Sequence, residues 1–152
     1  MMRIVQGVFA MGVLGSLLAA CAGERPQSLG VHDGALAPCP LSPNCVSSCA
    51  DDEQHRIDPL RFSNDPAVAF VRLRKILAGR YDTTFVREER SYLRVEFRTR
   101  LGFVDDGEFL LEPDGGFIHV RSASRLGYSD LGKNRARIEE IRSRFAVAER
   151  TK

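Results

Sequence analysis

The sequence predicts a single α+β domain: a four-stranded antiparallel sheet with an N-terminal and a C-terminal helix packed on it. Four consecutive runs have strand-like composition, and a helical pattern lies on each side of them. The length of 152 residues corresponds to about one domain at roughly 150 residues per domain. Hydrophobic residues (43%) and charged residues (28%) occur in ordinary globular proportions, which exclude a disordered, collagen-like or multispanning membrane protein.

Residues 1–20 are typical of an export signal, because no charge follows Arg3 until small residues precede Cys21. The ending Leu18-Ala19-Ala20-Cys21 resembles the lipobox of bacterial lipoproteins, in which the signal is cut before the cysteine and its thiol is acylated. The resemblance predicts lipidation of Cys21, with ordinary signal cleavage or an uncleaved anchor as alternatives. In Gram-negative cells, lipoproteins with aspartate after the cysteine tend to be held at the inner membrane. Because Ala22 follows Cys21 here, we expect an exported lipoprotein that, in a host with two membranes, lies at the outer membrane and faces the periplasm.

Residues 21–37 are rich in Gly, Pro, Ser and charge and have no apolar period. This composition predicts a lipid-anchored flexible tether that holds the domain about 20–25 Å from the anchor. We expect the domain to occupy residues 38–148, followed by a tail at 149–152.

The next segment is expected to be a rigid loop, because Pro38, Pro40 and Pro43 cannot be accommodated in a helix. An oxidising compartment makes Cys39 and Cys45 candidates for a disulfide, although the spacing also allows Cys45 with Cys49. A metal site formed by these three cysteines with His32 or His55 is an alternative, but C-x5-C-x3-C matches no usual C-x2-C zinc knuckle. We therefore expect no metal.

The first helix begins at Asn64-Asp65-Pro66, where a capping side chain precedes a proline at the first helical position. Apolar side chains at Phe70, Leu73 and Leu77 predict about 13 residues of helix, ending near Gly79.

Four strands are then expected at residues 81–87, 92–99, 103–111 and 117–122, with a hairpin turn at 113–116 between the last two. In the second strand, apolar and charged residues alternate, so that one face is buried. The last helix should begin near Ser129-Asp130 and run for about 16 residues, since Ile138, Ile141 and Phe145 share one face.

A basic block follows the last strand: residues 119–152 contain nine Lys and Arg against four Asp and Glu. Arg121 and Arg125, with nearby hydroxyl groups and a helix start, have the chemistry of an anion site. Alternatively, these arginines pair with carboxylates of the neighbouring strand, namely Asp105, Asp106 and Glu108.

The same carboxylates suggest a second chemistry, because Asp106, Glu108 and His119 could act as acid and base in a small hydrolase. Asp105 falls on the other face, with Phe103 and Phe109, and should be semi-buried against an arginine unless Gly107 forms a bulge. No nucleophile elbow, phosphate loop, dinucleotide fingerprint or zinc-protease motif is present, and no cofactor is implied. The basic residues of the last helix alternate with acids and lack aromatic partners, which disfavours nucleic-acid binding.

Three blocks of the chain, at residues 36–48, 102–109 and 118–135, resemble those of the domain-of-unknown-function 1499 family. The resemblance spans about residues 30–146 and implies no settled activity. Cys49 departs from the family pattern, so the resemblance favours Cys39 with Cys45 as the disulfide pair and Cys49 as a spare thiol. The matching positions are Cys39, Asn44, Cys45, Asp105, Asp106, Glu108, Arg121, Ser122, Ser124, Arg125, Tyr128, Asp130, Asn134 and Arg135.

The leading functional hypothesis is a lipid-anchored envelope protein that acts as a binding or interaction module. Its polar site would combine the proline-pinned loop with the basic block, and its partner would be an anionic small molecule or another envelope protein. The hydrolase and a purely structural envelope protein are the alternatives. The candidate ligand-binding residues are Asn44, Asp105, Arg121, Ser122, Ser124, Arg125, Tyr128, Asp130, Asn134 and Arg135.

Overall fold

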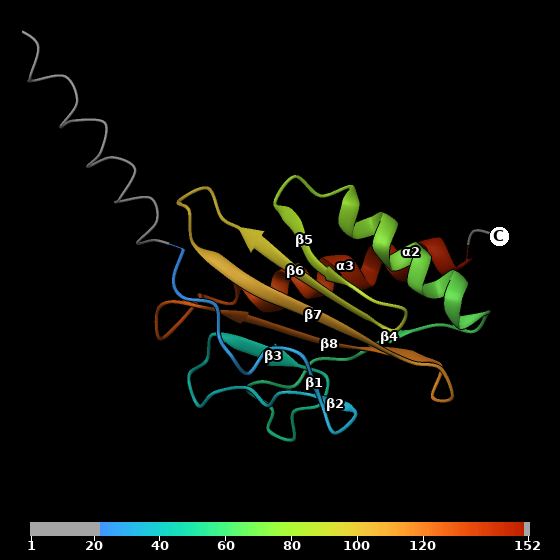
Figure 1. The fold of residues 1–152 in the computed structure, drawn as a ribbon, viewed down its shortest axis with the longest axis horizontal. Helices are drawn as coiled ribbons and strands as arrows, with labels where there is room; N and C mark the ends of the chain where they lie inside the picture. Colours follow the sequence, from blue (N-terminus) through green and yellow to red (C-terminus); the bar gives the residue numbers. More distant parts are fainter. Residues whose placement is uncertain (1–21, 151–152) are drawn as a thin grey trace, which may run out of the picture.

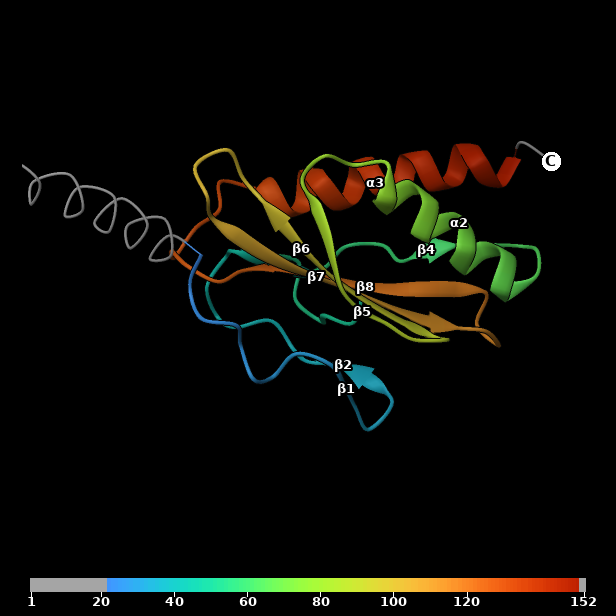
Figure 2. The same ribbon diagram turned by 45° about the horizontal axis from the view of Figure 1, so that its top comes forward.

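A computed structural model describes residues 22–150, so the expected export signal and Cys21 lie outside the described residues. The molecule has three layers (Figures 1 and 2): two helices cover one face of a sheet, and the N-terminal segment lies on the other. The predicted α+β class is confirmed, although the sheet has six strands rather than four. Within residues 22–150, no helix is both long enough and apolar enough to cross a membrane.

The four predicted strands form an antiparallel meander in the order β8-β7-β6-β5. Their bounds, within a few residues of the prediction, are β5 (Thr83–Glu88), β6 (Tyr92–Arg98), β7 (Val104–Glu112) and β8 (Phe117–Ser124).

Two short strands that the sequence did not predict extend the sheet beyond β8: β3 (Cys45–Ser47) and β4 (Leu60–Arg61). Cys45 pairs with Ala123, and Leu60 pairs with Ile118. Strands of two or three residues are too short to show an alternating pattern. Together they cover the edge that β8 would otherwise expose.

The helix α2 (Pro66–Ala78) begins directly after the predicted capping residue, and α3 (Lys133–Arg150) begins three residues after Asp130. In α2, Asp65 accepts hydrogen bonds from the N–H groups of Ala67 and Val68. In α3, Asp130 accepts from the N–H of Asn134 at 2.7 Å. The apolar faces of the two helices close the main core over the sheet; its largest fully buried side chains include Phe97, Phe109, Phe145, Leu60, Leu73, Leu77, Leu93, Ile118, Ile138 and Ile141.

The N-terminal segment contains a small hairpin, formed by β1 (Val31–His32) and β2 (Ala35–Leu36). Leu36 is buried with Tyr92 and Leu110 in a small second cluster on the outer face of the sheet. Residues 29–37 therefore lie on the domain and differ from the flexible tether that the composition predicts for 21–37. Isolated apolar residues show no period in the sequence, yet Leu29, Leu36 and Ala37 are buried.

Candidate functional site

The three carboxylates of β7 are all buried, and the strand directs them to two faces. Asp106 pairs with Ala123 and Glu108 with Arg121 in a continuous register through Gly107, without a bulge. Asp105 points to the helices, where it accepts a hydrogen bond from Arg137 of α3 at 2.8 Å. Asp105 has the arginine partner that the sequence analysis expected, and it is fully buried rather than semi-buried.

On the outer face, Arg125 forms a bidentate ion pair with Asp106, at 2.7 and 2.8 Å. Its Nη2 also donates to Glu96 at 2.6 Å, and Glu96 accepts a further bond from Arg25. The hydrogen bonds to Asp106 and Glu96 raise the pKa of Arg125 despite its burial. Burial alone would raise the pKa of Glu96, but the bonds from Arg25 and Arg125 lower it below its usual value.

Glu108 has no exposed surface and accepts three hydrogen bonds. The hydroxyl of Tyr92 and the N–H of Gly30 each donate to Oε1 at 2.7 Å, and Nη1 of Arg121 donates to Oε2 at 3.2 Å. Burial and the bond to Glu108 together raise the pKa of Tyr92. The bond from Gly30 attaches the N-terminal segment to the centre of the sheet.

Arg121 is the least satisfied member of this network. Its side chain is only 6% exposed, and besides the bond to Glu108 it makes one long contact, from Nη2 to the carbonyl oxygen of Pro38 at 3.5 Å. Among the described residues, its buried Nε has no hydrogen-bond partner. A guanidinium has five N–H donors; on the Nε–Nη2 edge of Arg121, Nε is unused and Nη2 makes only the long contact to Pro38.

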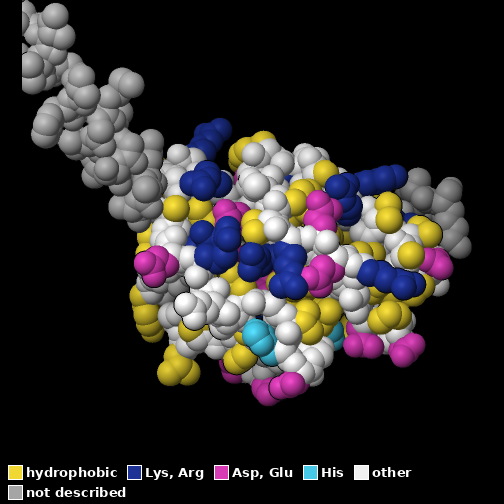
Figure 3. Space-filling model, in the orientation of Figure 1, with side chains coloured by type: hydrophobic (Ala, Val, Ile, Leu, Met, Phe, Trp, Pro, Cys, Tyr) yellow, Lys and Arg dark blue, Asp and Glu magenta, His cyan; other side chains and the backbone are white. Residues whose placement is uncertain are grey.

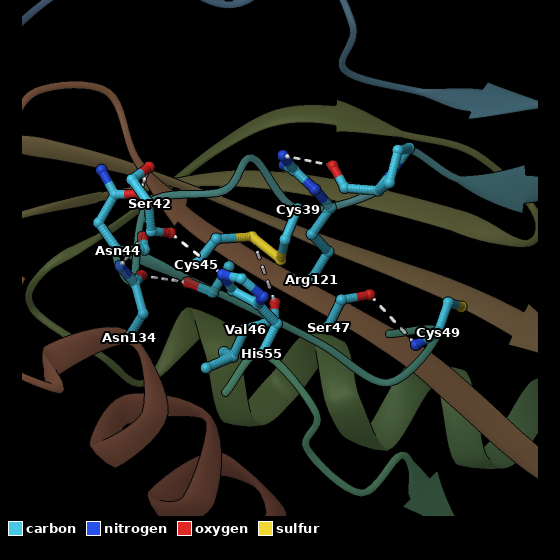
Figure 4. Close-up of a disulfide and its surroundings, with 12 residues drawn as sticks. Cys39, Ser42, Asn44, Cys45, Val46, Ser47, Cys49, His55, Arg121 and Asn134 are labelled. Atoms are coloured by element: carbon cyan, nitrogen blue, oxygen red, sulfur yellow. Dashed lines mark hydrogen bonds between the residues drawn. A yellow bond between two sulfur atoms is a disulfide. The ribbon is translucent and has the colours of Figure 1, made fainter. Parts of the chain in front are cut away.

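A cavity of about 400 Å³ lies beside Arg121. Pro26, Ser28 and Leu29 form one wall, and the proline-rich loop forms another. Figure 4 shows Arg121 next to the disulfide between Cys39 and Cys45, which closes this loop. The complete lining is Pro26, Ser28, Leu29, Pro38, Cys39, Pro40, Asp106, Arg121, Ala123 and Ser124.

Several other candidate residues hold the loop in place. Nδ2 of Asn134 donates to the carbonyl of Asn44 at 3.1 Å and to Oγ of Ser124 at 2.9 Å, while Ser122 donates to Oδ1 of Asn134 at 2.6 Å. Asn44 in turn donates to the carbonyl of Gly127 at 2.6 Å. These buried amide and hydroxyl groups satisfy one another, and they connect the loop to β8 and α3 (Figure 4).

The remaining candidates lie away from the cavity. Arg135 donates to the backbone carbonyls of Arg56 and Gln54, Asp130 caps α3, and Tyr128 is 76% exposed. The structure therefore brings the proline-rich loop together with Arg121, Asp106 and Ser124, but not with the whole basic block.

His119 does not converge with Asp106 and Glu108. Its Nδ1 lies 3.1 Å from Oγ of Ser48 and 3.4 Å from Sγ of Cys49, whereas the two carboxylates bind arginines. Burial lowers the pKa of His119. The hydrolase arrangement thus finds no support in the geometry.

The disulfide also bears on the metal alternative, because Cys39 and Cys45 have no free thiolates while Cys49 is free. Among residues 22–150, no group of three His, Cys, Asp or Glu side chains is arranged to hold a metal ion.

The sequence reasoning missed Tyr92, Gly30 and Arg137 as parts of the network. For Arg137 a signal was present: it lies four residues before Ile141 and so shares the buried face of the last helix. Gly30 carried no such signal, because its partner Glu108 is 78 residues away.

Comparison with known families gives one match: the model of a protein family of unknown function (DUF1499) matches residues 35–145. This range contains the disulfide, all four meander strands and most of α3. No protein with a curated description matches the chain.

Proposed function

The chain belongs to the DUF1499 family, whose function is unknown, and from that premise we propose that it is a lipid-anchored envelope protein that binds a small carboxylate-bearing molecule at Arg121. The supporting observation is that this buried guanidinium, which lines a cavity, has an unpartnered Nε and only a 3.5 Å contact from Nη2 to Pro38, which a ligand would displace. Two parallel N–H donors on one edge match the two oxygens of a carboxylate.

The charges of the outer face favour one carboxylate rather than a multiply charged anion. Three arginines there (Arg25, Arg121 and Arg125) form ion pairs with three carboxylates (Glu96, Asp106 and Glu108), so the ion-paired cluster is formally neutral. Arg94 of β6, opposite Glu108, adds one positive charge beside the cluster. A single carboxylate can replace the weak contact to Pro38 without breaking an ion pair, whereas a phosphate dianion would meet Asp106 and Glu108 nearby. The side chains of Pro26, Leu29 and Pro38 offer the rest of the ligand an apolar wall.

The attachment to the membrane is proposed from the sequence. The lipobox-like residues Leu18–Cys21 support acylation of Cys21, and two or three acyl chains would make the attachment effectively permanent. Ala22 supports the outer membrane, facing the periplasm. Intact-mass measurement of the chain purified from bacterial membranes tests this: cleavage before Cys21 with a diacylglycerol adduct is expected, and a chain without an adduct would contradict it.

Ligand binding can be tested through the arginine Nε–Hε resonances of the 15N-labelled protein in detergent micelles. The Arg121 resonance is identified by its loss in Arg121→Lys. We expect it to move and saturate on titration with butyrate to about 0.1 M, since a site with a Kd near 1 mM would then be full. Sodium chloride at equal ionic strength should leave it in place.

Arg125 provides the matched control, because its Nε already donates to Asp106 at 2.7 Å and its resonance should not respond. If the Arg121 resonance moves no more than the Arg125 resonance on titration with butyrate, the binding proposal is wrong. The network would then have a purely structural role, since each of its six charges has a partner within the protein.

A further inference from the structure

One end of the molecule exposes large apolar side chains on two neighbouring loops. The β6–β7 loop carries Leu101 and Phe103, and the β8–α3 loop carries Leu126, Tyr128 and Leu131. Leu101 is 73% exposed and Leu131 is 89% exposed. Figures 1 and 2 show that both loops lie at the end of the sheet where the described chain begins. We call these five residues the loop-end surface.

Four of the five residues of the loop-end surface adjoin one another, and Tyr128 lies between two of them in the β8–α3 loop. Leu101, Phe103, Leu126 and Leu131 line one shallow hollow of about 220 Å³ between the two loops. Leu131 also has a φ of 56°, a left-handed conformation that is uncommon for a bulky residue. Neither its exposure nor its backbone conformation favours leucine for folding, so this side chain is better explained by a contact outside the domain.

Basic side chains border the loop-end surface. Arg98, Arg100 and Lys133 line an adjoining hollow together with Leu101, and none of the three forms an ion pair with another described residue. Figure 3 shows Lys and Arg beside hydrophobic side chains at this end. The acids that line the two hollows already have partners: Asp130 accepts from N–H groups at the start of α3, Asp82 pairs with Arg80, and Asp105 pairs with Arg137. Glu24, next to Gly23 in the chain, is exposed.

The N-terminal segment begins against this same surface. Gly23 has a φ of 65°, and a Cβ at its position would lie 2.9 Å from Cβ of Arg125 and 2.9 Å from Cγ of Leu126. Residue 23 is therefore held against the β8–α3 loop. Cys21 precedes it by two residues, which span at most about 7 Å when extended. The headgroup layer of one leaflet is about 5–8 Å thick, so an acyl chain on Cys21 leaves no gap between the domain and the bilayer.

We propose that the loop-end surface lies on the lipid bilayer, with its apolar side chains at the boundary between headgroups and acyl chains. Arg98, Arg100 and Lys133 then meet anionic headgroups. The inference rests on the proposed acylation of Cys21 for its geometry, while the exposed side chains and their charges support it separately. The bilayer thereby fixes the orientation of the domain, which is not suspended on a tether.

The chain contains no tryptophan, so single substitutions can report on lipid contact. The full chain with Leu101→Trp or Tyr128→Trp is reconstituted into vesicles of phosphatidylethanolamine and phosphatidylglycerol, with and without lipids brominated on their acyl chains. Because side chains of interfacial segments lie about 5–10 Å into the headgroup–acyl boundary, we expect bromine to reduce their emission by about twofold or more. Val68→Trp, at an exposed position of α2, should show no quenching.

A charge-reversed variant tests the headgroup contact. Adding Lys133→Glu and Arg100→Glu to Tyr128→Trp should weaken quenching in the anionic vesicles and leave it unchanged in vesicles of phosphatidylcholine alone. The docking proposal is wrong if Leu101→Trp and Tyr128→Trp are quenched no more than Val68→Trp although the chain carries its lipid adduct and floats with the vesicles. That result would leave the proposed acylation of Cys21 supported. If no adduct is found and the chain does not float, the anchor fails, and with it the geometric basis for docking.

Discussion

Replacing Glu108 with glutamine isolates the charge at the centre of the network. Both bonds from Tyr92 and Gly30 go to Oε1, so the amide carbonyl of Glu108→Gln can keep them. The amide nitrogen then faces Nη1 of Arg121, which places a donor against a donor. The guanidinium, whose side chain is 6% exposed, is left buried without its counter-charge.

Removing one partner of a buried ion pair costs about 3–5 kcal/mol, a large part of the total stability of about 5–15 kcal/mol for a domain. With an m-value of about 2 kcal/mol/M, the urea midpoint followed by circular dichroism should fall by about 1.5–2.5 M. The matched control is Glu88→Gln, which removes the same charge from an exposed pair with Arg74 and should cost about 1 kcal/mol or less.

The double variant Glu108→Gln, Arg121→Met completes a thermodynamic cycle. Because it removes both charges, its stability loss should be smaller than the sum of the two single losses by at least about 1 kcal/mol. A midpoint shift for Glu108→Gln no larger than that of Glu88→Gln, or strictly additive losses, would refute the assignment of Glu108 as the counter-charge of Arg121.

Three further predictions test other parts of the structure. Gly107→Ala would place a Cβ 2.3 Å from Cε2 of Phe97, so the unfolding free energy in urea should fall by about 1–3 kcal/mol; a neutral result would contradict this packing. The hydrogen bond to Asp52 raises the pKa of His55 despite burial. The stability that protonated His55 contributes is therefore fully present below the unfolded pKa of about 6.5 and is lost as pH rises through the higher folded pKa. The stability difference between the wild type and His55→Gln should therefore be largest near pH 5.5 and shrink by about pH 8, and a difference that grows with pH would reverse the assignment. Among the three described cysteines, iodoacetamide should modify only Cys49 in the folded, unreduced protein and reach Cys39 and Cys45 only after reduction, because those two form the disulfide; modification of all three before reduction, measured by peptide mass, would exclude the bond.

Local patterns were sufficient to predict the main elements. Asp65 followed by Pro66 placed the start of α2, alternation along residues 93–98 placed β6, and Pro113–Gly116 placed the turn between β7 and β8. Each of these features acts through contacts between residues near one another in the chain, so the sequence displays it directly.

The site was predicted less completely. Two interpretations of Arg121 and Arg125 remained open, because a sequence shows that arginines and carboxylates alternate on adjacent strands but not whether all their donors are used. The structure shows Arg125 with three short bonds and Arg121 with an unpartnered Nε. The contact from Arg121 to Pro38 joins residues that are 83 positions apart in the chain, so the sequence could not show it.

The sequence by itself determined the α+β class, the two helices and the four-stranded meander, because helix capping, side-chain periodicity and turn chemistry are local properties. Only the tertiary structure decided that residues 29–37 lie on the domain, that β3 and β4 cover the edge of β8, and that Gly23 lies against Arg125 and Leu126. These arrangements depend on single contacts between distant residues, such as the bond from Gly30 to Glu108. A contact of that kind leaves no repeating pattern in the chain, since its energy comes from the partner's position in space.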